Sequence, residues 1–542
     1  MILGRKKWSL VYFLVAALLV LGCNRQRDGW TIDALVPLVH SNLNLENIFA
    51  DSLLVPGTDN VLHVVYEDTI TTFKVDDDLD FPDTTVTQVN RGPAVTINWD
   101  KTVPLISDTS DNSFRIDVMD LTTARIKSGS IDFNVISSIT EETEVTFIMP
   151  SAQKGGQFLS VKTIIPASPS LTNPTVVSVN IDLSGYEMDL TGVDKKDYNT
   201  IFSYFVVEFT DPLNPSTTYP YGPSDYVNFE IGFRDIVPDY GKGYFFTQVV
   251  SEASSTDQRL DLFDRITSGT MDLEEVNLNF TLINEVGADI TARVNSLTGI
   301  NSKTNESVDL QGDLIGTSLN INRAREDYSI PFPHTVATRY EYNMNTSNSN
   351  VDKMIESFLD SIAYDIEFTI NPRGNISGSN DYIFAGTGIT AMLDADIPLC
   401  LIANELALVD TADFMPGDRD DNLNNIVGGY LNVHCYNRYP FDAKLQMTLI
   451  DASGRKLIDL LEEGAKIEGA VPDANGRTTA PIHSLIKAPA TPEAIDAFFR
   501  AERAIIRLTL DTKSGDQHAK IYADYDCEVK VVGDFKYNTS LR

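Results

Sequence analysis

The sequence has 542 residues, with 77 acidic and 42 basic side chains and a formal net charge of −35. This length exceeds one ordinary hydrophobic core and predicts several domains. So strong a negative charge excludes nucleic acid as a partner, because the phosphate backbone would repel it. Apart from Cys23 the cysteines are Cys400, Cys435 and Cys527, and no Cys-x-x-Cys occurs. A disulfide framework and a thiolate metal site are therefore excluded.

The amino-terminal stretch decides the compartment. Basic residues 5–7 precede an uncharged apolar run over residues 8–21, too short to span a bilayer comfortably, and Gly22 then precedes Cys23. This arrangement resembles a bacterial lipoprotein signal, in which the cysteine thiol takes a diacylglycerol and becomes the mature amino terminus. The resemblance implies a signal peptide over residues 1–22 and lipidation of Cys23, whose acyl chains would hold the chain on a membrane. The alternative is an ordinary cleaved secretory signal in which Cys23 carries no lipid.

The residues that follow Cys23 bear on sorting. Asn24 is not the aspartate that retains enterobacterial lipoproteins at the inner membrane, and residues 25–28 lack the acidic cluster that resembles a surface-export signal in Bacteroidota. The resemblance therefore implies an outer-membrane anchor with the body facing the periplasm, and it leaves surface exposure open. No second run of eighteen or more apolar residues follows, so the lipid would be the membrane attachment.

Residues 23–120 form an N-terminal region that we predict to be β-rich. Short apolar-alternating segments, such as residues 61–66, are separated there by clusters of Gly, Pro and Asp. This pattern is typical of strands joined by turns. Whether the region is a domain of its own stays open.

From residue 121 onward the sequence repeats itself. Residues 126–133 (IKSGSIDF) are echoed at 266–273 (ITSGTMDL) and more faintly at 426–433 (IVGGYLNV), with glycines 140 and then 160 residues apart. Each echo is followed by a polar turn and a second alternating strand, which predicts a hairpin. So long a period indicates duplicated domains rather than a solenoid. The predicted domains are residues 121–258, 259–417 and 418–542.

Each repeat also contains a predicted helix that leads directly into a strand. Residues 194–202 form the first of these helices. Asn350 caps the second, whose apolar residues continue to Ile362, and Thr491 with Pro492 at the first helical position begins the third. Strands, frequent turns and one short helix per repeat predict an all-β, mainly antiparallel fold of tandem β-sandwich domains.

The third repeat carries a local resemblance. Residues 430–443 (YLNVHCYNRYPFDA) show a strand, Asn, Pro-Phe, strand pattern and are similar to late-embryogenesis-abundant type-2 β-sandwich domains. The mature chain as a whole resembles uncharacterised β-rich outer-membrane lipoproteins of Bacteroidota. That resemblance implies location and fold, and no chemistry.

Candidate catalytic motifs are fragmentary. Residues 110–112 (Ser-Asp-Asn), Ser151 with Lys154, and residues 513–515 (Lys-Ser-Gly) match pieces of penicillin-recognising serine enzymes. Their order is wrong, and the glycines after Lys154 prevent the helix that the Ser-x-x-Lys motif needs, so we interpret them as turn residues. The six histidines are scattered, without an HExxH motif or a pair at helical spacing. The sequence therefore predicts no enzyme.

One segment has the beginning of a calcium loop. Asp418, Asp420 and Asn422 alternate as the first ligands of an EF-hand do, but Leu423 stands where that loop needs glycine and Gly429 where it needs glutamate. An exposed linker between domains is the alternative interpretation. Beyond the covalent lipid on Cys23, no other cofactor is predicted.

These observations predict a lipid-anchored envelope protein that acts as a non-enzymatic interaction or structural module of an outer-membrane complex, with an envelope protein as partner. One alternative is a carrier of a hydrophobic ligand, which needs an unfilled apolar cavity of at least a few hundred Å³. The other is a surface glycan-binding or adhesive lipoprotein.

Overall fold

The structure is a computed structural model that describes residues 30–43, 53–74, 81–254, 263, 266–329, 334–413 and 426–539. Strands make up 64% of it and helices 4%, which confirms the predicted all-β fold. The chain divides into two compact units, each built from segments far apart in sequence. Unit 1 holds Met1–Val65, Asp261–Val276 and Asp396–Arg542, and unit 2 holds Tyr66–Leu260 and Asn277–Ala395.

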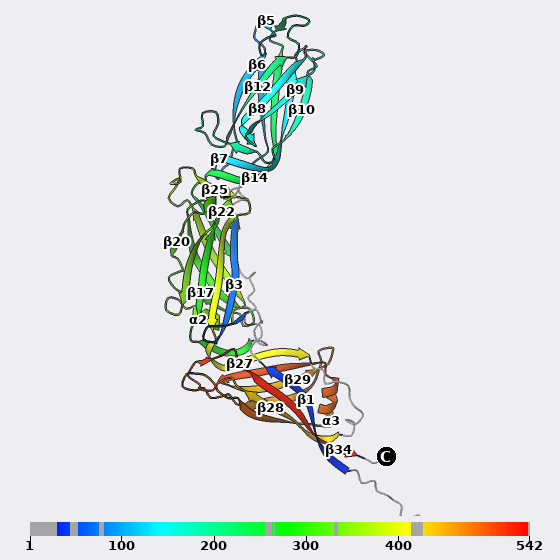
Figure 1. Cartoon of the computed structure of the whole chain (residues 1–542), viewed down its shortest axis with the longest axis vertical. Coiled ribbons are helices and arrows are strands. Elements are labelled where there is room, and N and C mark those ends of the chain that lie inside the picture. Colours follow the sequence, from blue (N-terminus) through cyan, green and yellow to red (C-terminus); the bar gives the residue numbers. More distant parts are fainter. Residues whose placement is uncertain are drawn as a thin grey trace, which may run out of the picture. The chain divides into compact units, whose positions relative to one another are not determined.

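Part of unit 2 is a sandwich whose two antiparallel layers of four strands, which we call its two sheets, belong to one continuous ten-stranded sheet (Figure 1). The first sheet consists, in order, of β10 (Thr175–Asp182), β7 (Asp120–Ser137), β14 (Tyr226–Tyr244) and β4 (Thr84–Arg91). The second consists of β9 (Gln157–Ile165), β8 (Thr143–Lys154), β12 (Thr200–Phe209) and β6 (Ile106–Ser113). The short strand β11 (Glu187–Asp189) pairs with both β7 and β8, and β5 (Ile97–Asp100) pairs with β13 (Thr218–Tyr221). We call this sandwich 1.

Four phenylalanines fill the centre of sandwich 1. Phe133 and Phe229 come from one sheet, Phe147 and Phe205 come from the other, and all four are fully buried. Their rings stack between the sheets, with centroids 4.8 Å apart for Phe133 and Phe147 and 4.4 Å apart for Phe205 and Phe229. Alternation of inward apolar and outward polar residues along each strand places these rings on the inner faces.

Unit 2 also contains a second pair of sheets. One sheet includes β3 (Leu62–Lys74), β26 (Gly388–Pro398), β17 (Asn277–Asn284) and β23 (Thr338–Asn345), with β2 (Leu54–Pro56) beside β3. The other includes β15 (Gln248–Ser254), β24 (Ser361–Ile370) and β18 (Ile290–Asn301), with β19 (Glu306–Asp309) and β20 (Ser318–Ile321) both on β18. Three further strands are β25 (Asp381–Phe384), which pairs with β14, and the ribbon β21 (Arg325–Asp327) with β22 (His334–Val336). Phe73 of β3 stacks on Phe368 of β24 at 6.3 Å, which brings the two sheets face to face.

Unit 1 contains the third pair of sheets, which we call sandwich 3. Its first sheet consists, in order, of β1 (Trp30–Leu43), β34 (Cys527–Thr539), β28 (Ile426–Asn437) and β31 (Ile482–Pro489). Its second consists of β16 (Ile266–Leu273), β27 (Cys400–Asp413), β32 (Arg503–Thr512), β29 (Phe441–Ile450) and β30 (Lys456–Ile467), with β33 (Ala519–Lys520) on β27. Inward residues of both sheets, among them Val433 and Leu445, form one continuous core together with Phe498 of the helix α3 (Pro492–Arg500).

The repeated glycine has a common structural role. Gly129 in β7, Gly269 in β16 and Gly429 in β28 all have positive φ angles, of 138°, 95° and 143°. Gly129 and Gly269 lie where the register with the partner strand shifts, and in the third echo the shift falls just before Gly429, between Ile426 and Gly428, so each echo contains a β-bulge. A side chain at Gly269 or Gly429 would collide with the carbonyl oxygen of Glu405 or Asp534 across the pair, so these positions require glycine.

The second echo also shows how the chain passes between the units. Its strand β16 pairs with β27 in unit 1, whereas the next strand, β17, lies in unit 2. The segment predicted as one domain over residues 259–417 therefore contributes to both units.

A buried polar residue ends one strand in each of the three pairs of sheets, at the end of β7, of β17 and of β28. Ser137, Asn284 and Asn437 each accept a hydrogen bond from the backbone N–H two residues further on, at 3.2, 2.8 and 2.9 Å. The amides of Asn284 and Asn437 also donate to the carbonyl oxygens of Ala288 and Phe441, four residues on. Such local bonds fix the turn before the next strand, and they show the same turn three times over.

The helices differ from the prediction in two of three repeats. The helix predicted over residues 194–202 is wrong: residues 194–199 form turns and irregular backbone, and residues 200–202 already belong to β12. Lys195 and Asn199 have left-handed φ angles, and no apolar stripe holds a helix on the core. The second helix, α2 (Val351–Glu356), forms, but Asn350 does not cap it; its Oδ1 accepts from the Gln311 N–H instead. The third, α3 (Pro492–Arg500), begins as predicted, with the Thr491 hydroxyl accepting from the Ala494 N–H.

Candidate functional site

Several predicted site residues lie outside the described residues. They are the lipidation residue Cys23 and the calcium candidates Asp418, Asp420 and Asn422. Both predictions stay untested. Among the described residues, no helix is long and apolar enough to cross a membrane.

The serine-enzyme fragments do not form one site. The Ser151 hydroxyl is buried and accepts a hydrogen bond from the Phe202 N–H at 2.9 Å, and Lys154 donates to the Ser184 carbonyl oxygen at 2.7 Å. Lys513 belongs to unit 1, where its amine donates to Asp442 at 3.0 Å. Each of these groups therefore has a structural partner. The interpretation as turn residues holds for residues 513–515 but is wrong for the other two fragments, since residues 110–112 lie in strand β6 and Ser151 and Lys154 lie in strand β8.

The five histidines whose side chains the structure describes separate into carboxylate-paired residues and one close pair. Those that face a carboxylate are His63 on Asp396, His334 on Asp327 and His518 on Asp272. The close pair is His434 of β28 with His483 of β31, whose Nδ1 and Nε2 atoms lie 3.0 Å apart. In the part of the chain that the structure describes, no group of three or more His, Cys, Asp and Glu side chains is placed to hold a metal ion.

The three described cysteines are buried free thiols in unit 1. Burial raises the pKa of Cys527 to about 12 and that of Cys435 to about 11. Burial and a hydrogen bond to Glu274 raise the pKa of Cys400 to about 12. A thiol reacts as its thiolate, so at neutral pH these groups behave as small apolar side chains.

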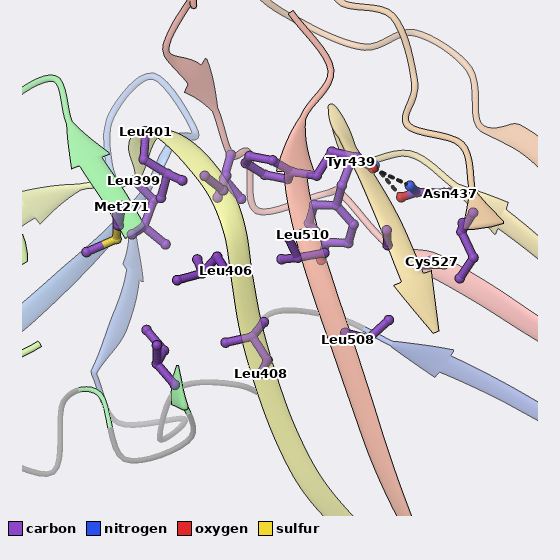
Figure 2. A pocket seen from close by; sticks show the side chains of 16 residues that line it. Met271, Leu399, Leu401, Leu406, Leu408, Asn437, Tyr439, Leu508, Leu510 and Cys527 are labelled. Atoms are coloured by element: carbon purple, nitrogen blue, oxygen red, sulfur yellow. Dashed lines mark hydrogen bonds between the residues drawn. The ribbon is translucent and has the colours of Figure 1, made fainter. Parts of the chain in front are cut away.

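An apolar cavity lies between the two sheets of sandwich 3 (Figure 2). Leu406 and Leu408 of β27 and Leu508 and Leu510 of β32 line one side, and Cys527 of β34 lines the other. Its few polar groups are satisfied by the protein itself: the Asn437 amide donates to the carbonyl oxygens of Phe441 and Glu468, and the Tyr439 hydroxyl donates to the Tyr525 carbonyl oxygen at 2.8 Å. The lining offers apolar contact and no reactive group.

The size of the cavity limits what it can hold. Its volume is about 90 Å³. A water molecule occupies about 30 Å³ in the liquid, an engineered cavity of about 150 Å³ takes up benzene, and sites for drug-sized ligands span roughly 300–1,000 Å³. The cavity is therefore well below the size that the carrier hypothesis requires.

Sandwich 1 presents an open sheet edge. Among the described residues β10 pairs with β7 alone, and its register over eight residues shows no bulge. The strand is uncharged from Thr175 to Ile181 (TVVSVNI), and Val176 is 59% exposed. On the neighbouring edge strand β9, Phe158 and Ile164 are each 53% exposed. A regular, uncharged edge with exposed apolar residues is a template for pairing with another chain.

The opposite edge of the same sheet is built differently. Strand β4 also has a well-exposed valine, Val89, and each of the two strands is charged only at its last residue, Arg91 or Asp182, so the difference lies in side-chain contacts. The Gln88 amide donates a short hydrogen bond to Asp108 of β6, so side chains join the two sheets on this side. We therefore take the β10 edge, with the exposed residues of β9 beside it, as the candidate functional site, and call it the β10 edge.

Sequence reasoning did not single out the β10 edge or the His434–His483 pair. The alternation in residues 175–182 was readable as a strand, but an edge is known only when the pairing is known. His434 and His483 come together because Tyr436 of β28 pairs with His483 of β31, a cross-strand contact without a local signal.

Comparisons with known proteins add little to this geometry. No family model and no curated protein matches the chain, so the similarity to late-embryogenesis-abundant type-2 domains has no support. Among solved structures the chain is similar to a protein of Parabacteroides distasonis ATCC 8503, a member of the Bacteroidota, described as a candidate secreted protein. That match has 13% identity and a TM-score of 0.27 and covers 54% of this chain and 89% of the other. A structure of infectious bursal disease virus strain Gx matches at 9% identity and a TM-score of 0.08, over 84% and 80%. At such scores neither similarity carries an argument about function.

Proposed function

We propose that this chain is a lipid-anchored protein of the bacterial outer membrane, facing the periplasm, whose tandem β-sandwiches act as a non-enzymatic interaction module for an envelope protein. The observation that carries the proposal is the β10 edge. Its backbone can receive an extended segment of the partner as an additional strand, and the exposed side chains Val176, Phe158 and Ile164 favour a partner segment with apolar residues.

Charge supports a protein partner over other polymers. The net charge of −35 repels nucleic acid and anionic lipid head groups. Strand β10 is uncharged from Thr175 to Ile181, and backbone pairing at such an edge does not depend on charge. The partner therefore contributes an apolar extended strand rather than a strongly basic or acidic one.

Site-specific photo-crosslinking in cells tests the edge. A photoreactive residue in place of Val176 should give a crosslinked protein that mass spectrometry identifies, and Val176→Lys should reduce recovery of the same complex, because an edge lysine opposes pairing. The matched control is Val89 on β4, which is 52% exposed on the opposite edge of the same sheet. Equal crosslinking from both positions, or none from Val176, would contradict the proposal.

The anchor has a separate test. Cys23→Ser should remove the acyl mass from the purified protein and release it from the membrane fraction, because the lipid supplies the membrane affinity. A chain of unchanged mass and location in this variant would refute lipidation. Protease treatment of intact cells then separates the two orientations, since a periplasm-facing chain is protected and a surface adhesin is cleaved.

A further inference from the structure

The outer face of the β1-β34-β28-β31 sheet carries an ordered group of side chains that the proposed function does not use. His434 and Tyr436 of β28 alternate outward, and His483 of β31 lies beside both. The His483 ring stacks on Tyr436 with centroids 4.7 Å apart and lies nearly parallel to the His434 ring, at 10°. Two strands and one aromatic ring thus position the two imidazoles next to each other.

The two ring nitrogens lie at a hydrogen-bond distance that is also close to the separation of two ligands on one metal ion. Because the ring centroids are 5.2 Å apart, the nitrogens point nearly at each other, so the rings must turn for both to face one ion. Nδ1 of His434 and Nε2 of His483 are 3.0 Å apart. Imidazole nitrogens lie about 2.0–2.1 Å from a bound transition-metal ion, so two ligands at right angles are separated by about 3.0 Å. We propose that His434 and His483 form a bidentate binding site for a divalent transition-metal ion, with water completing its coordination.

The charged side chains around His434 and His483 repel a metal cation only weakly. Lys530 of β34 lies opposite His434, but its amine is 2.7 Å from the Glu528 carboxylate and 5.2 Å from the centre of the Tyr436 ring. The lysine charge is therefore balanced locally by a carboxylate. For an ion to bind, the hydrogen shared between the two rings must move to another ring nitrogen or to water, so binding weakens in acid.

The chemistry of the pair selects the kind of ion. Neutral imidazoles suit zinc, copper and nickel, while calcium and magnesium prefer oxygen ligands. For a given nitrogen site the affinity rises to a maximum at Cu²⁺. We therefore expect Cu²⁺ to bind most tightly, then Zn²⁺ and Ni²⁺, and Ca²⁺ not to compete.

Copper titration of the purified full-length protein without a histidine tag tests the site. The electron paramagnetic resonance spectrum of the tightest bound Cu²⁺ should show coupling to two imidazole nitrogens. His434→Gln and His483→Gln should each weaken this binding at least tenfold, and the double variant should be no weaker than either single one. His483→Phe is a second test, because it keeps the ring on Tyr436 and removes the ligand nitrogens.

The control is His518→Gln. His518 also lies in unit 1 and faces Asp272 alone at 3.2 Å, so its loss should leave copper affinity within about twofold. A spectrum with oxygen ligands only would overturn the proposal, because the many carboxylates of the chain would then hold the copper. Unchanged affinity in the His434 or His483 variants, or an equal loss in the His518 variant, would overturn it as well. The measurement needs no partner, so its result is independent of the β10 edge.

Discussion

Sandwich 1 and sandwich 3 share one architecture and fill it differently. In sandwich 1 four phenylalanine rings fill the space between the sheets. The ring centroids of Phe205 and Phe229, which come from opposite sheets, are 4.4 Å apart. In sandwich 3 leucines, alanines and Cys527 meet across the same kind of gap and leave about 90 Å³ unfilled. At about 24 cal/mol per Å³, such a cavity costs about 2 kcal/mol. Side-chain size, rather than topology, thus decides whether this kind of sandwich is solid or hollow.

The largest expected loss of stability comes from removing a ring from the filled core of sandwich 1. Phe205→Ala removes a ring that contacts the rings of both sheets, so it should cost about 3–5 kcal/mol. Hydrogen exchange of peptides from β7, β8, β12 and β14 measures this loss locally, which a chain of several domains requires. Phe158→Ala is the control, because that ring is 53% exposed on β9, and it should have little effect. Similar losses in both variants would mean that the phenylalanine stack is not the centre of stability.

Alkaline pH should lower the stability of unit 1, which contains sandwich 3, before it lowers that of unit 2. Cys400, Cys435 and Cys527 lie in unit 1, and unit 2 contains no cysteine. Because their folded pKa values are about 11–12 against an ordinary value of 9.0, the unfolded state releases protons first as pH rises, and the stability of unit 1 falls. The expected loss is about 1 kcal/mol per thiol for each pH unit above 9.

The thiols can be distinguished from other titrating groups in a defined pH range. Between pH 9 and 10 unit 1 should lose protection against hydrogen exchange while unit 2 keeps it. Above that range tyrosines of unit 2 begin to contribute, since burial and the neighbouring Glu326 raise the pKa of Tyr328 to about 12. Serine in place of all three cysteines should abolish the loss between pH 9 and 10. A loss that begins equally in both units would contradict the assignment to thiols.

The smallest expected effect comes from filling the cavity. Ala443 of β29 lines it, so Ala443→Val adds two carbons where space exists and should stabilise unit 1 by about 1 kcal/mol. Ala152 of β8 is fully buried in sandwich 1, and Ala152→Val should destabilise that sandwich by about 1–3 kcal/mol through overpacking. Urea dependence of hydrogen exchange in each unit gives both values. Effects of the same sign would show that the two cores do not differ in free space.

Sequence patterns were sufficient to predict the fold class and to locate part of the internal repeat. Alternation predicted the strands because each has one buried face, and the glycine echo marked a bulge that occurs three times. The helix at residues 194–202 failed because charged residues gave a helix-like composition without an apolar stripe, and tertiary contacts then selected turns.

The candidate sites depended on information that a single sequence does not contain. Val176 and Val89 look alike in sequence, and only the pairing of β10 and β4 shows that one edge is open and the other is joined to β6. The cavity beside Leu508 results from small differences in side-chain volume, and the two nitrogens of His434 and His483 meet through cross-strand register. The predictions for Cys23 and for the loop beginning at Asp418 stay predictions.

The pairing of β1 with β34 has a consequence for synthesis. Thirteen residue pairs, from Trp30 with Thr539 to Leu43 with Cys527, join the first described strand to the last. At about 5–20 residues per second, β1 leaves the ribosome roughly 25–100 seconds before its partner strand. Throughout that interval a fourteen-residue strand has no native neighbour on that edge. Sandwich 3 can therefore complete its folding only after residues 527–539 have been made, whereas the strands of sandwich 1 all lie between residues 84 and 244.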